Sequence, residues 1–180
     1  HPCERRCRRG LLDAPINIRG IKKFAVDSCA ADKAPVPARS AQTNRRVAVI
    51  GGGPSGLTCA YYQSLMGHDV VIFEARKHLG GMLRYGIPAY RLPRERLEED
   101  INAILSVGGI EVRLETKVGT QAVAELQNEF DAVYVAIGAQ KGKGLRIDGA
   151  KAEGVISAVD LLGRIGDGAY PDFSGKRVAV

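Results

Sequence analysis

A glycine-rich loop between an apolar run and a helix-like stretch constrains the fold of this chain more than any other feature. The apolar run spans 47–50, and Gly51, Gly53 and Gly56 follow it with the spacing Gly-x-Gly-x-x-Gly. A helix-like stretch begins at Pro54, inside the same loop. In such units the first glycine permits a tight turn, the second lets a phosphate approach the backbone, and the third lets the helix pack close to the strand. We therefore expect the first strand, loop and helix of a parallel α/β sheet here.

An acidic residue directly follows the second strand-like run. This run spans 70–73, and Glu74 stands 18 residues after Gly56. A carboxylate at the end of the second strand can accept hydrogen bonds from ribose hydroxyls of an adenosine. The helix that begins at Pro54 and Ser55 adds unpaired N–H groups and a dipole that favours phosphate. Strand, loop, helix and carboxylate together predict a nucleotide site of the Rossmann type, which the glycine pattern alone would indicate only weakly.

Glu74 and Arg76 bear on which nucleotide such a site would take. Glu74 repels a 2′-phosphate and, when ionised, offers it no hydrogen-bond donor. Arg76 is a possible donor, but we expect it at the surface or beside the pyrophosphate rather than as a 2′-phosphate clamp. The pattern therefore favours a dinucleotide with free ribose hydroxyls, and by itself it leaves both FAD and NAD open.

The rest of the chain alternates between short apolar runs and helix-like stretches. Continuous apolar strands separated by helices predict a parallel sheet covered on both faces, with each strand buried. Thr120 and Ser157 are the expected N-caps of two of the helices. The expected strands are 47–50, 70–73, 110–114, 132–137 and 177–180, and the expected helices are 18–25, 54–66, 93–105, 120–126 and one that follows Ser157.

Residues 28–44 are typical of a linker, because they include Pro35, Pro37 and many small or polar residues without an apolar period. The last residues, 175–180, are similar in sequence to 44–49, the stretch that leads into the glycine loop. We therefore expect 175–180 to be the first strand of a second nucleotide-binding domain. We also expect that a longer polypeptide extends beyond both ends of this sequence.

The net charge of +6 is concentrated in residues 1–46, which hold 11 Lys and Arg against 4 Asp and Glu. A basic arm can bind nucleic acid or an acidic protein, or surround an anionic prosthetic group. Interleaved aromatic residues are missing from it, which argues against nucleic acid. No apolar run approaches the roughly 18 residues that a membrane span needs. The cysteine spacing does not predict a secreted disulfide framework, and we expect a cytoplasmic protein.

A second glycine pair follows the acidic residue within a few positions. The segment 74–83 ends in Gly80-Gly81-Met82-Leu83, where backbone N–H groups can reach a long dinucleotide beyond its pyrophosphate. This arrangement resembles the FAD-binding domains of flavoproteins of the disulfide-reductase type. The segment 131–139 resembles the strand by which those domains return to FAD, and Val118 stands where they place a backbone contact to adenine.

The segment 85–93, Tyr-Gly-Ile-Pro-Ala-Tyr-Arg-Leu-Pro, makes the resemblance closer. With the stretch 15–22 it is similar to the small subunit of glutamate synthase and its relatives, which include the N-terminal half of dihydropyrimidine dehydrogenase and the large subunit of electron-bifurcating transhydrogenases. The resemblance covers nearly the whole chain and implies an NAD(P)H-binding domain from about Val178 onwards. It implies that FAD is bound by Gly51, Gly53, Pro54, Ser55, Gly56, Glu74, Ala75, Arg76, Gly81, Met82, Arg91, Val118, Ala136, Ile137 and Gly138.

Cys3 and Cys7 form a Cys-x-x-x-Cys pair near the start of the chain. On a helical turn, residues four apart share one face, so both sulfurs could meet one metal ion. The pair alone is a weak signal, since an iron–sulfur cluster needs four ligands as a rule. The family resemblance implies that Cys3 and Cys7 end a domain with two [4Fe–4S] clusters, whose other cysteines would precede His1. The ligand set here is then incomplete.

The resemblance gives the expected organisation. Residues 1–27 are expected to end an iron–sulfur helical domain and 28–44 to link it to the next domain. Residues 45–174 are expected to form an incomplete Rossmann-like FAD-binding domain, and 175–180 to begin the NAD(P)H-binding domain.

The main hypothesis is a flavin and iron–sulfur oxidoreductase that passes electrons between NAD(P)H, FAD and [4Fe–4S] clusters, with a redox partner subunit or a ferredoxin-like protein. No residue has the pattern of a catalytic acid or base, and this part alone is expected to be inactive. Two alternatives remain open from the residues: an NAD-binding module without flavin, and a non-catalytic electron-transfer scaffold subunit.

Overall fold

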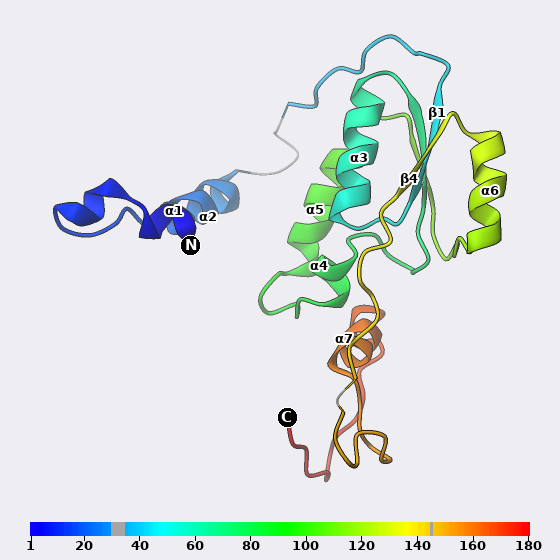
Figure 1. The fold of residues 1–180 in the computed structure, drawn as a ribbon. Helices are drawn as coiled ribbons and strands as arrows, with labels where there is room; N and C mark the ends of the chain where they lie inside the picture. The colour runs from blue at the N-terminus through cyan, green and yellow to red at the C-terminus, as the bar shows by residue number, and fades with distance from the viewer. Residues whose placement is uncertain (30–34, 145) are drawn as a thin grey trace. The chain divides into compact units, whose positions relative to one another are not determined.

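The chain divides into two compact units in the computed structural model, which describes residues 1–29, 35–144 and 146–180 (Figure 1). The units are His1–Pro35 and Val36–Val180. The division falls inside the expected linker 28–44. The domain boundaries given above remain predictions, and each unit is described by itself.

Three short helical elements make up the N-terminal unit. They are α1 (Pro2–Arg5), the 3-10 helix η1 (Arg8–Leu11) and α2 (Ile18–Ser28). The side chain of Asn17 caps α2 by accepting a hydrogen bond of 3.0 Å from the Gly20 N–H. Glu4 Oε1 accepts a hydrogen bond from the Arg19 N–H over 2.9 Å and so ties α1 to α2. None of the described residues of this unit, 1–29 and 35, is buried.

A four-stranded parallel sheet organises the second unit and confirms the expected α/β fold. The strand order is β3-β2-β1-β4, and every pairing is parallel. β1 is central, and its residues Val47–Ile50 pair with Val70–Phe73 of β2. The elements of this unit are β1 (Arg46–Ile50), α3 (Pro54–Leu65), β2 (Asp69–Phe73), α4 (Met82–Tyr85), α5 (Arg94–Leu105), β3 (Ile110–Arg113), α6 (Thr120–Glu129), β4 (Ala132–Val135) and α7 (Ala158–Gly166).

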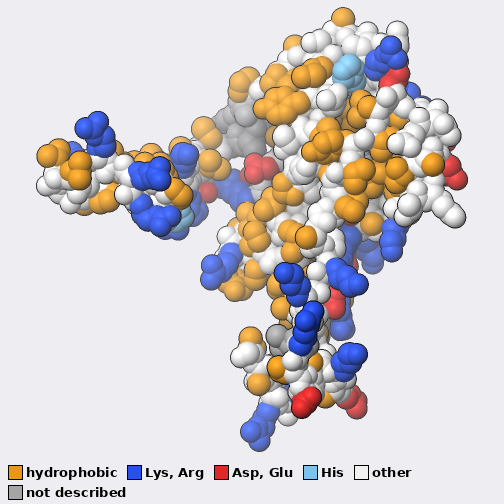
Figure 2. Space-filling model, in the orientation of Figure 1, with side chains coloured by type: hydrophobic (Ala, Val, Ile, Leu, Met, Phe, Trp, Pro, Cys, Tyr) orange, Lys and Arg blue, Asp and Glu red, His pale blue; other side chains and the backbone are white. Residues whose placement is uncertain are grey.

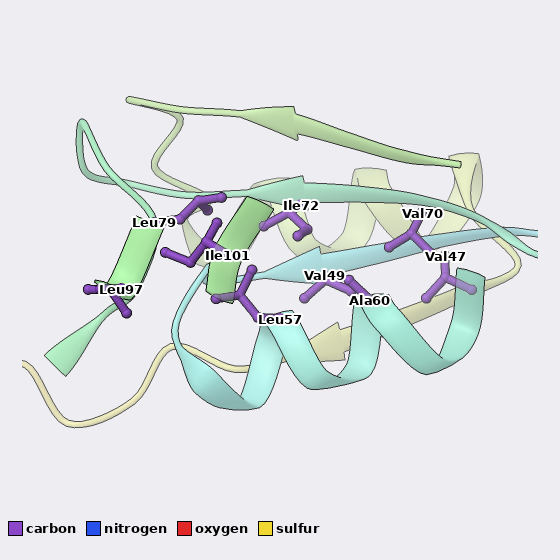
Figure 3. Packing of buried hydrophobic residues seen from close by; sticks show 9 residues of the cluster. All are labelled: Val47, Val49, Leu57, Ala60, Val70, Ile72, Leu79, Leu97 and Ile101. Carbon is purple, nitrogen blue, oxygen red and sulfur yellow. The ribbon is translucent and has the colours of Figure 1, made fainter. Parts of the chain in front are cut away.

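Two hydrophobic clusters fill the space between the sheet and its helices. On one face, side chains of β1 and β2 pack against α3 and α5, with Ile72 and Val49 fully buried (Figure 3). On the other face, Phe73 meets Phe130 at the end of α6 with ring centroids 6.0 Å apart and nearly perpendicular planes. Because successive side chains of a strand point to opposite faces, the continuous apolar runs of β1 and β2 supply both clusters.

The structure differs from the sequence expectation at β4 and at the C-terminal segment. The apolar sequence of β4 predicts burial, yet Val135 is 57% exposed, because β4 is an edge strand with a neighbour on one side only. Residues 177–180 form no strand, and their side chains are exposed. A strand needs a partner for its backbone groups, and no described strand pairs with this segment. Gly119, not Thr120, is the N-cap of α6, whereas Ser157 caps α7 as expected.

The second half of the expected linker is part of the α/β unit. The Ser40 N–H donates to Leu65 O and the Thr43 N–H to Gly67 O, at 2.9 and 3.1 Å. The guanidinium of Arg39 donates to Ser64 O and pairs with Asp69. These bonds fix the chain against the turn between α3 and β2 before it enters β1.

Helix α7 packs against α4 through a close contact at Gly166. A Cβ at this position would overlap the ring of Tyr85. We therefore expect Gly166→Ala to lower the free energy of unfolding by about 1–3 kcal/mol, the usual cost of overpacking, although alanine is ordinarily the better helix former. Urea unfolding measures the change.

Gly144→Ala is the control, because a methyl group added at Gly144 would meet no described atom within 4 Å and the residue has no positive φ. We expect it to change stability by less than about 0.5 kcal/mol. Equal effects of the two substitutions would contradict the contact between Gly166 and Tyr85.

Candidate functional site

The loop from Gly51 to Gly56 turns tightly between β1 and α3. Gly51 has a φ of +108°, which an L side chain rarely adopts, and its N–H donates to Phe73 O over 2.8 Å. A Cβ at Gly51 would lie 2.5 Å from Ala136 O, and one at Gly56 would overlap Gly51 O. The backbone approaches both positions so closely that only glycine fits, as the sequence predicts for the first and third glycine of the motif.

Gly53 occupies the N-cap position of α3 and carries no side chain over the first turn of this helix. No side chain caps this helix, so the N–H groups of its first turn have no intrahelical partner. A Cβ at Gly53 would meet only Gly81 Cα, at 3.6 Å. The loop thus presents bare backbone amides and the positive end of the α3 dipole, the arrangement that binds a phosphate.

Glu74 lies directly beside this loop, at the carboxyl end of β2. Its residue is only 7% exposed, and each of its carboxylate oxygens accepts one backbone hydrogen bond. Oε2 accepts from the Gly52 N–H at 2.7 Å and Oε1 from the Arg76 N–H at 2.8 Å. A carboxylate offers about four lone-pair sites, so both oxygens keep acceptor capacity for a ligand's hydroxyl groups.

The glycine pair 80–81 is pinned to the glycine loop. The Gly80 N–H donates to Gly52 O over 2.8 Å, and a Cβ at Gly81 would lie 2.7 Å from Gly53 Cα. Gly81 has a φ of +52° and is the N-cap of the one-turn helix α4, which begins at Met82. The two glycine segments, which are separate in the sequence, therefore form one continuous backbone surface.

The end of β4 lies next to the same loop. The Ala136 N–H donates to Ile50 O over 2.8 Å, which places Ala136 beside Gly51. Ile137 is 62% exposed, and Gly138 follows it with a φ of +65°. Val118 packs partly buried against the cluster around α6. Ser55 at the start of α3 shares a hydrogen bond of 3.0 Å with the Tyr134 hydroxyl of β4.

No described hydrogen bond or ion pair joins the side chains of three expected cofactor residues, Ala75, Arg76 and Arg91, to the glycine loop. Ala75 is exposed beside Glu74. The Arg76 side chain turns away to Asp167 and Tyr85, although its N–H holds Glu74. Arg91 lies in an exposed turn, and no hydrogen bond or ion pair of the described residues joins it to the glycine loop.

Two arginines that sequence analysis did not single out shape the loop after Gly81. Arg84 is 7% exposed, donates to Leu79 O over 3.2 Å and pairs with Glu98. Burial lowers the pKa of the Arg84 guanidinium. Arg94 donates to two carbonyl groups of the same loop, those of residues 83 and 87. An arginine in or beside a loop gives no signal by itself, because the carbonyl partners are invisible in a sequence.

An open depression lies beside the start of α3. Figure 2 shows hydrophobic side chains gathered over α3 and β4 on the visible face of this unit. Tyr62 and Met66 of this surface are 55% and 56% exposed. The depression is lined by Pro54, Ser55, Thr58, Cys59, Tyr62 and Tyr134.

Cys3 and Cys7 do not share a helical face, contrary to the sequence expectation. α1 ends at Arg5, so Cys7 lies outside it and serves as the N-cap of η1 with extended backbone. Backbone N–H groups of Ile16, Arg9 and Gly10 donate toward the Cys7 sulfur and lower the pKa of its thiol. Within residues 1–29, 35–144 and 146–180, no group of three or more His, Cys, Asp or Glu side chains could hold a metal ion.

The different surroundings of two cysteines give a test of the N-terminal unit. Amide donors lower the pKa of the Cys7 thiol, whereas burial raises that of Cys59. Because the thiolate is the reactive form, Cys7 is expected to be alkylated by iodoacetamide at lower pH than Cys59. Peptide mass spectrometry over a pH series measures both midpoints. Earlier alkylation of Cys59 would contradict the hydrogen bonds described at Cys7.

A helix that crosses a bilayer must be both long and apolar. None of the helices in the described part of the chain is both long enough and apolar enough to cross a bilayer.

Residues 49–99 match the model of a protein family described as the NAD(P)-binding Rossmann-like domain. These residues include the glycine loop, α3, β2 and Glu74.

Two curated relatives match over almost the whole chain. The NADPH-Fe(3+) oxidoreductase subunit beta of Geobacter sulfurreducens is 40% identical over 100% of this chain and 28% of the relative. The glutamate synthase (NADPH) small chain of Bacillus subtilis is 33% identical over 99% of this chain and 38% of the relative. The chain thus spans well under half the length of either relative.

A solved structure has a similar fold. FprA, an oxidoreductase from Mycobacterium tuberculosis, superposes with a TM-score of 0.61 and 25% identity over 73% of this chain and 32% of FprA. The fold of most of this chain is therefore also found in a solved oxidoreductase.

Proposed function

We propose, from the premise that this chain belongs to the family of oxidoreductase subunits that includes the glutamate synthase small chain, that it is the FAD-binding part of an NAD(P)H-dependent oxidoreductase. The two relatives described above are named for NADPH, one as a subunit beta and the other as a small chain. The complete protein would take electrons from NAD(P)H and pass them through FAD and [4Fe–4S] clusters to a partner.

The observation that carries the proposal is the bare backbone surface beside Glu74. No side chain stands at Gly53 or Gly81, and the uncapped amides of α3 border this surface. An anionic diphosphate suits those amides, and ribose hydroxyls suit the remaining acceptor sites of Glu74. The donor set therefore fits the adenosine diphosphate half of FAD.

The second glycine pair, 80–81, favours a long dinucleotide such as FAD, because it extends the binding surface beyond the pyrophosphate. The Gly80 N–H bond to Gly52 O brings the start of α4 next to the pyrophosphate position, so Met82 would border the ligand beyond its diphosphate. Ala136 and Gly138 would flank the same ligand from β4. Bound FAD would supply hydride acceptance and single-electron transfer, while the residues of this chain bind and orient it.

The N-terminal unit supports the iron–sulfur part of the proposal. Cys7 stands among three backbone N–H donors, a setting that stabilises a thiolate and a bound anionic cluster. Arg5, Arg6 and Arg8 are exposed around it and add positive charge. Cys3 and Cys7 would be two ligands of a cluster that needs further ligands from outside this sequence. The same basic surface would face an acidic redox partner.

A second candidate function is NAD(P) binding at the same loop without flavin. The family model that matches residues 49–99 is described by NAD(P) binding, which favours this alternative. The two functions separate in a titration of the purified full chain with FAD and with NADH, each followed by fluorescence.

For an FAD site we expect one FAD bound per chain, the visible absorption bands of a flavoprotein, and no displacement of FAD by NADH. If NADH binds at the loop and FAD does not compete with it, the NAD(P) function replaces the FAD proposal. If neither nucleotide binds, both proposals for this loop are wrong.

A further inference from the structure

A group of three side chains joins the loop after Glu74 to helix α7. Arg76 Nη1 lies 3.2 Å from Asp167 Oδ2, and the Arg76 guanidinium carbon lies 4.5 Å from the centroid of the Tyr85 ring. Asp167 is the C-cap of α7, and α4 and α7 pack together (Figure 1). The members of this group come from distant parts of the sequence, since Arg76 and Asp167 are 91 positions apart.

The surface of α7 has room for this group. A Cβ at Gly163 would lie 3.1 Å from Arg76 Nη2, and a Cβ at Gly166 would overlap the Tyr85 ring. Glycine is a poor helix former, so two glycines on this side of a helix of nine residues are costly unless the space is used. The space is used by the Arg76 guanidinium and the Tyr85 ring.

The direction of the Arg76 side chain is the unexpected feature. Its own N–H donates to Glu74 Oε1, so the side chain starts next to a carboxylate. An ion pair with Glu74 would be the short local choice, yet among the described ion pairs Arg76 is joined to Asp167. Asp167 therefore draws the guanidinium away from the place where Glu74 offers its free acceptor sites.

Further contacts keep Asp167 in this arrangement. Burial and the negative charge of Asp167 raise the pKa of the Tyr85 hydroxyl to about 12, so the hydroxyl stays protonated. Asp167 Oδ1 is buried without a hydrogen bond among the described residues. The Arg76 guanidinium at Oδ2 and the Tyr85 hydroxyl, whose pKa a hydrogen bond with this carboxylate helps to raise, compensate the charge of Asp167. A second arginine near the strand ends, Arg113, is paired with Glu111 at 2.7 Å.

The position of Arg76 matters for nucleotide selection. A ribose bound by Glu74 would carry its 2′ substituent beside the backbone of Arg76. A guanidinium at that place would bind a 2′-phosphate by charge-assisted hydrogen bonds, whereas a lone carboxylate repels it. The two curated relatives described above are named for NADPH, so a nucleotide with a 2′-phosphate is a competitor that an FAD site in such an enzyme must exclude.

We propose, on the basis of the FAD site proposed above, that Asp167 is a positioning residue that holds Arg76 away from the ribose and thereby makes the site reject nucleotides with a 2′-phosphate. Asp167 does not touch the nucleotide. It acts through Arg76, and helix α7 thus contributes to the selectivity of a loop that lies at the end of β2.

The test measures competition with FAD, because only a nucleotide that binds at the FAD site can compete there. The full chain is freed of flavin, and FAD rebinding is followed by fluorescence in the presence of ADP or of 2′,5′-ADP. In the unsubstituted protein ADP should compete with FAD and 2′,5′-ADP should compete at least about tenfold less well. In Asp167→Asn, 2′,5′-ADP should compete about tenfold better than before, with ADP unchanged.

Three further variants complete the experiment. Asp160→Asn, an exposed aspartate in the first turn of α7, is the matched control and should leave the ratio of the two competitors unchanged. Adding Arg76→Gln to Asp167→Asn should remove the gain in 2′,5′-ADP binding. Arg76→Gln alone should not weaken the binding of 2′,5′-ADP relative to that of ADP. This variant decides the question if Asp167→Asn does not fold.

Two results overturn the inference while FAD and ADP still bind. One is an unchanged competitor ratio in Asp167→Asn. The other is weaker binding of 2′,5′-ADP, relative to ADP, to the Arg76→Gln variant. That result would mean that Arg76 already contacts the 2′-phosphate in the unsubstituted protein. Absence of FAD binding to the unsubstituted protein is a different outcome, which overturns the proposed function itself and the inference with it.

Discussion

Replacement of Gly53 by alanine is expected to remove most of the FAD binding and to leave the fold intact. The new methyl group has room, since its nearest neighbour would be Gly81 Cα at 3.6 Å, and the φ of −79° suits alanine. The same methyl group would occupy the space over the uncapped amides of α3. A diphosphate displaced from these amides loses charge-assisted hydrogen bonds, so we expect FAD affinity to fall by roughly a hundredfold.

Gly119→Ala is the matched control for Gly53→Ala. Gly119 is the N-cap of α6 and has a similar extended backbone with a φ of −88°, and a Cβ there would meet no described atom within 4 Å. Both substitutions replace glycine by alanine, which is less favourable at an N-cap. Each variant should therefore lose no more than about 1 kcal/mol of stability in urea unfolding. Only Gly53→Ala should lose FAD binding in a fluorescence titration. Equal FAD affinities in the two variants would show that the ligand is not bound over Gly53.

Glu74→Gln is expected to weaken FAD binding and to destabilise the protein. Both carboxylate oxygens accept a backbone hydrogen bond, from Gly52 and from Arg76, and an amide has only one acceptor oxygen. One buried N–H would then face the amide NH₂ group, at a cost of about 1–3 kcal/mol in unfolding free energy. The ribose hydroxyls would also lose a charged acceptor, and we expect the FAD dissociation constant to rise by roughly a hundredfold.

Glu95→Gln serves as the control for the change of charge, because Glu95 is exposed in the first turn of α5. It should leave FAD affinity unchanged and alter stability by less than about 0.5 kcal/mol. Titration calorimetry and urea unfolding on the same samples separate the two effects of Glu74→Gln. Unchanged FAD affinity in Glu74→Gln would mean that this carboxylate does not hold the ribose.

The parts of the site that sequence predicted are those that local chemistry determines. The turn at Gly51, the close packing at Gly56 and the position of Glu74 after β2 follow from short-range spacing along one strand, loop and helix. The parallel sheet follows in the same way from the continuous apolar runs of β1 and β2. In these segments, local preference and tertiary structure agree.

The parts that sequence did not predict depend on partners distant along the chain. The side chain of Arg76 has a carboxylate two positions away, and nothing local shows that it turns to Asp167 instead. The exposure of β4 follows from its edge position in the sheet, which its apolar sequence does not reveal. Cys7 lies off the helical face that the sequence predicts it to share with Cys3, because α1 ends at Arg5. The length of so short a helix depends on contacts such as that from Glu4 to Arg19, more than on residue preference.

A crystal structure of the chain with FAD tests the central claim most directly. We expect electron density for the diphosphate against the backbone of Gly53 at the start of α3, with both hydroxyls of the adenosine ribose within hydrogen-bond distance of the Glu74 carboxylate. Density for FAD elsewhere on the chain, with the space over Gly53 and Gly81 filled by side chains, would contradict the account.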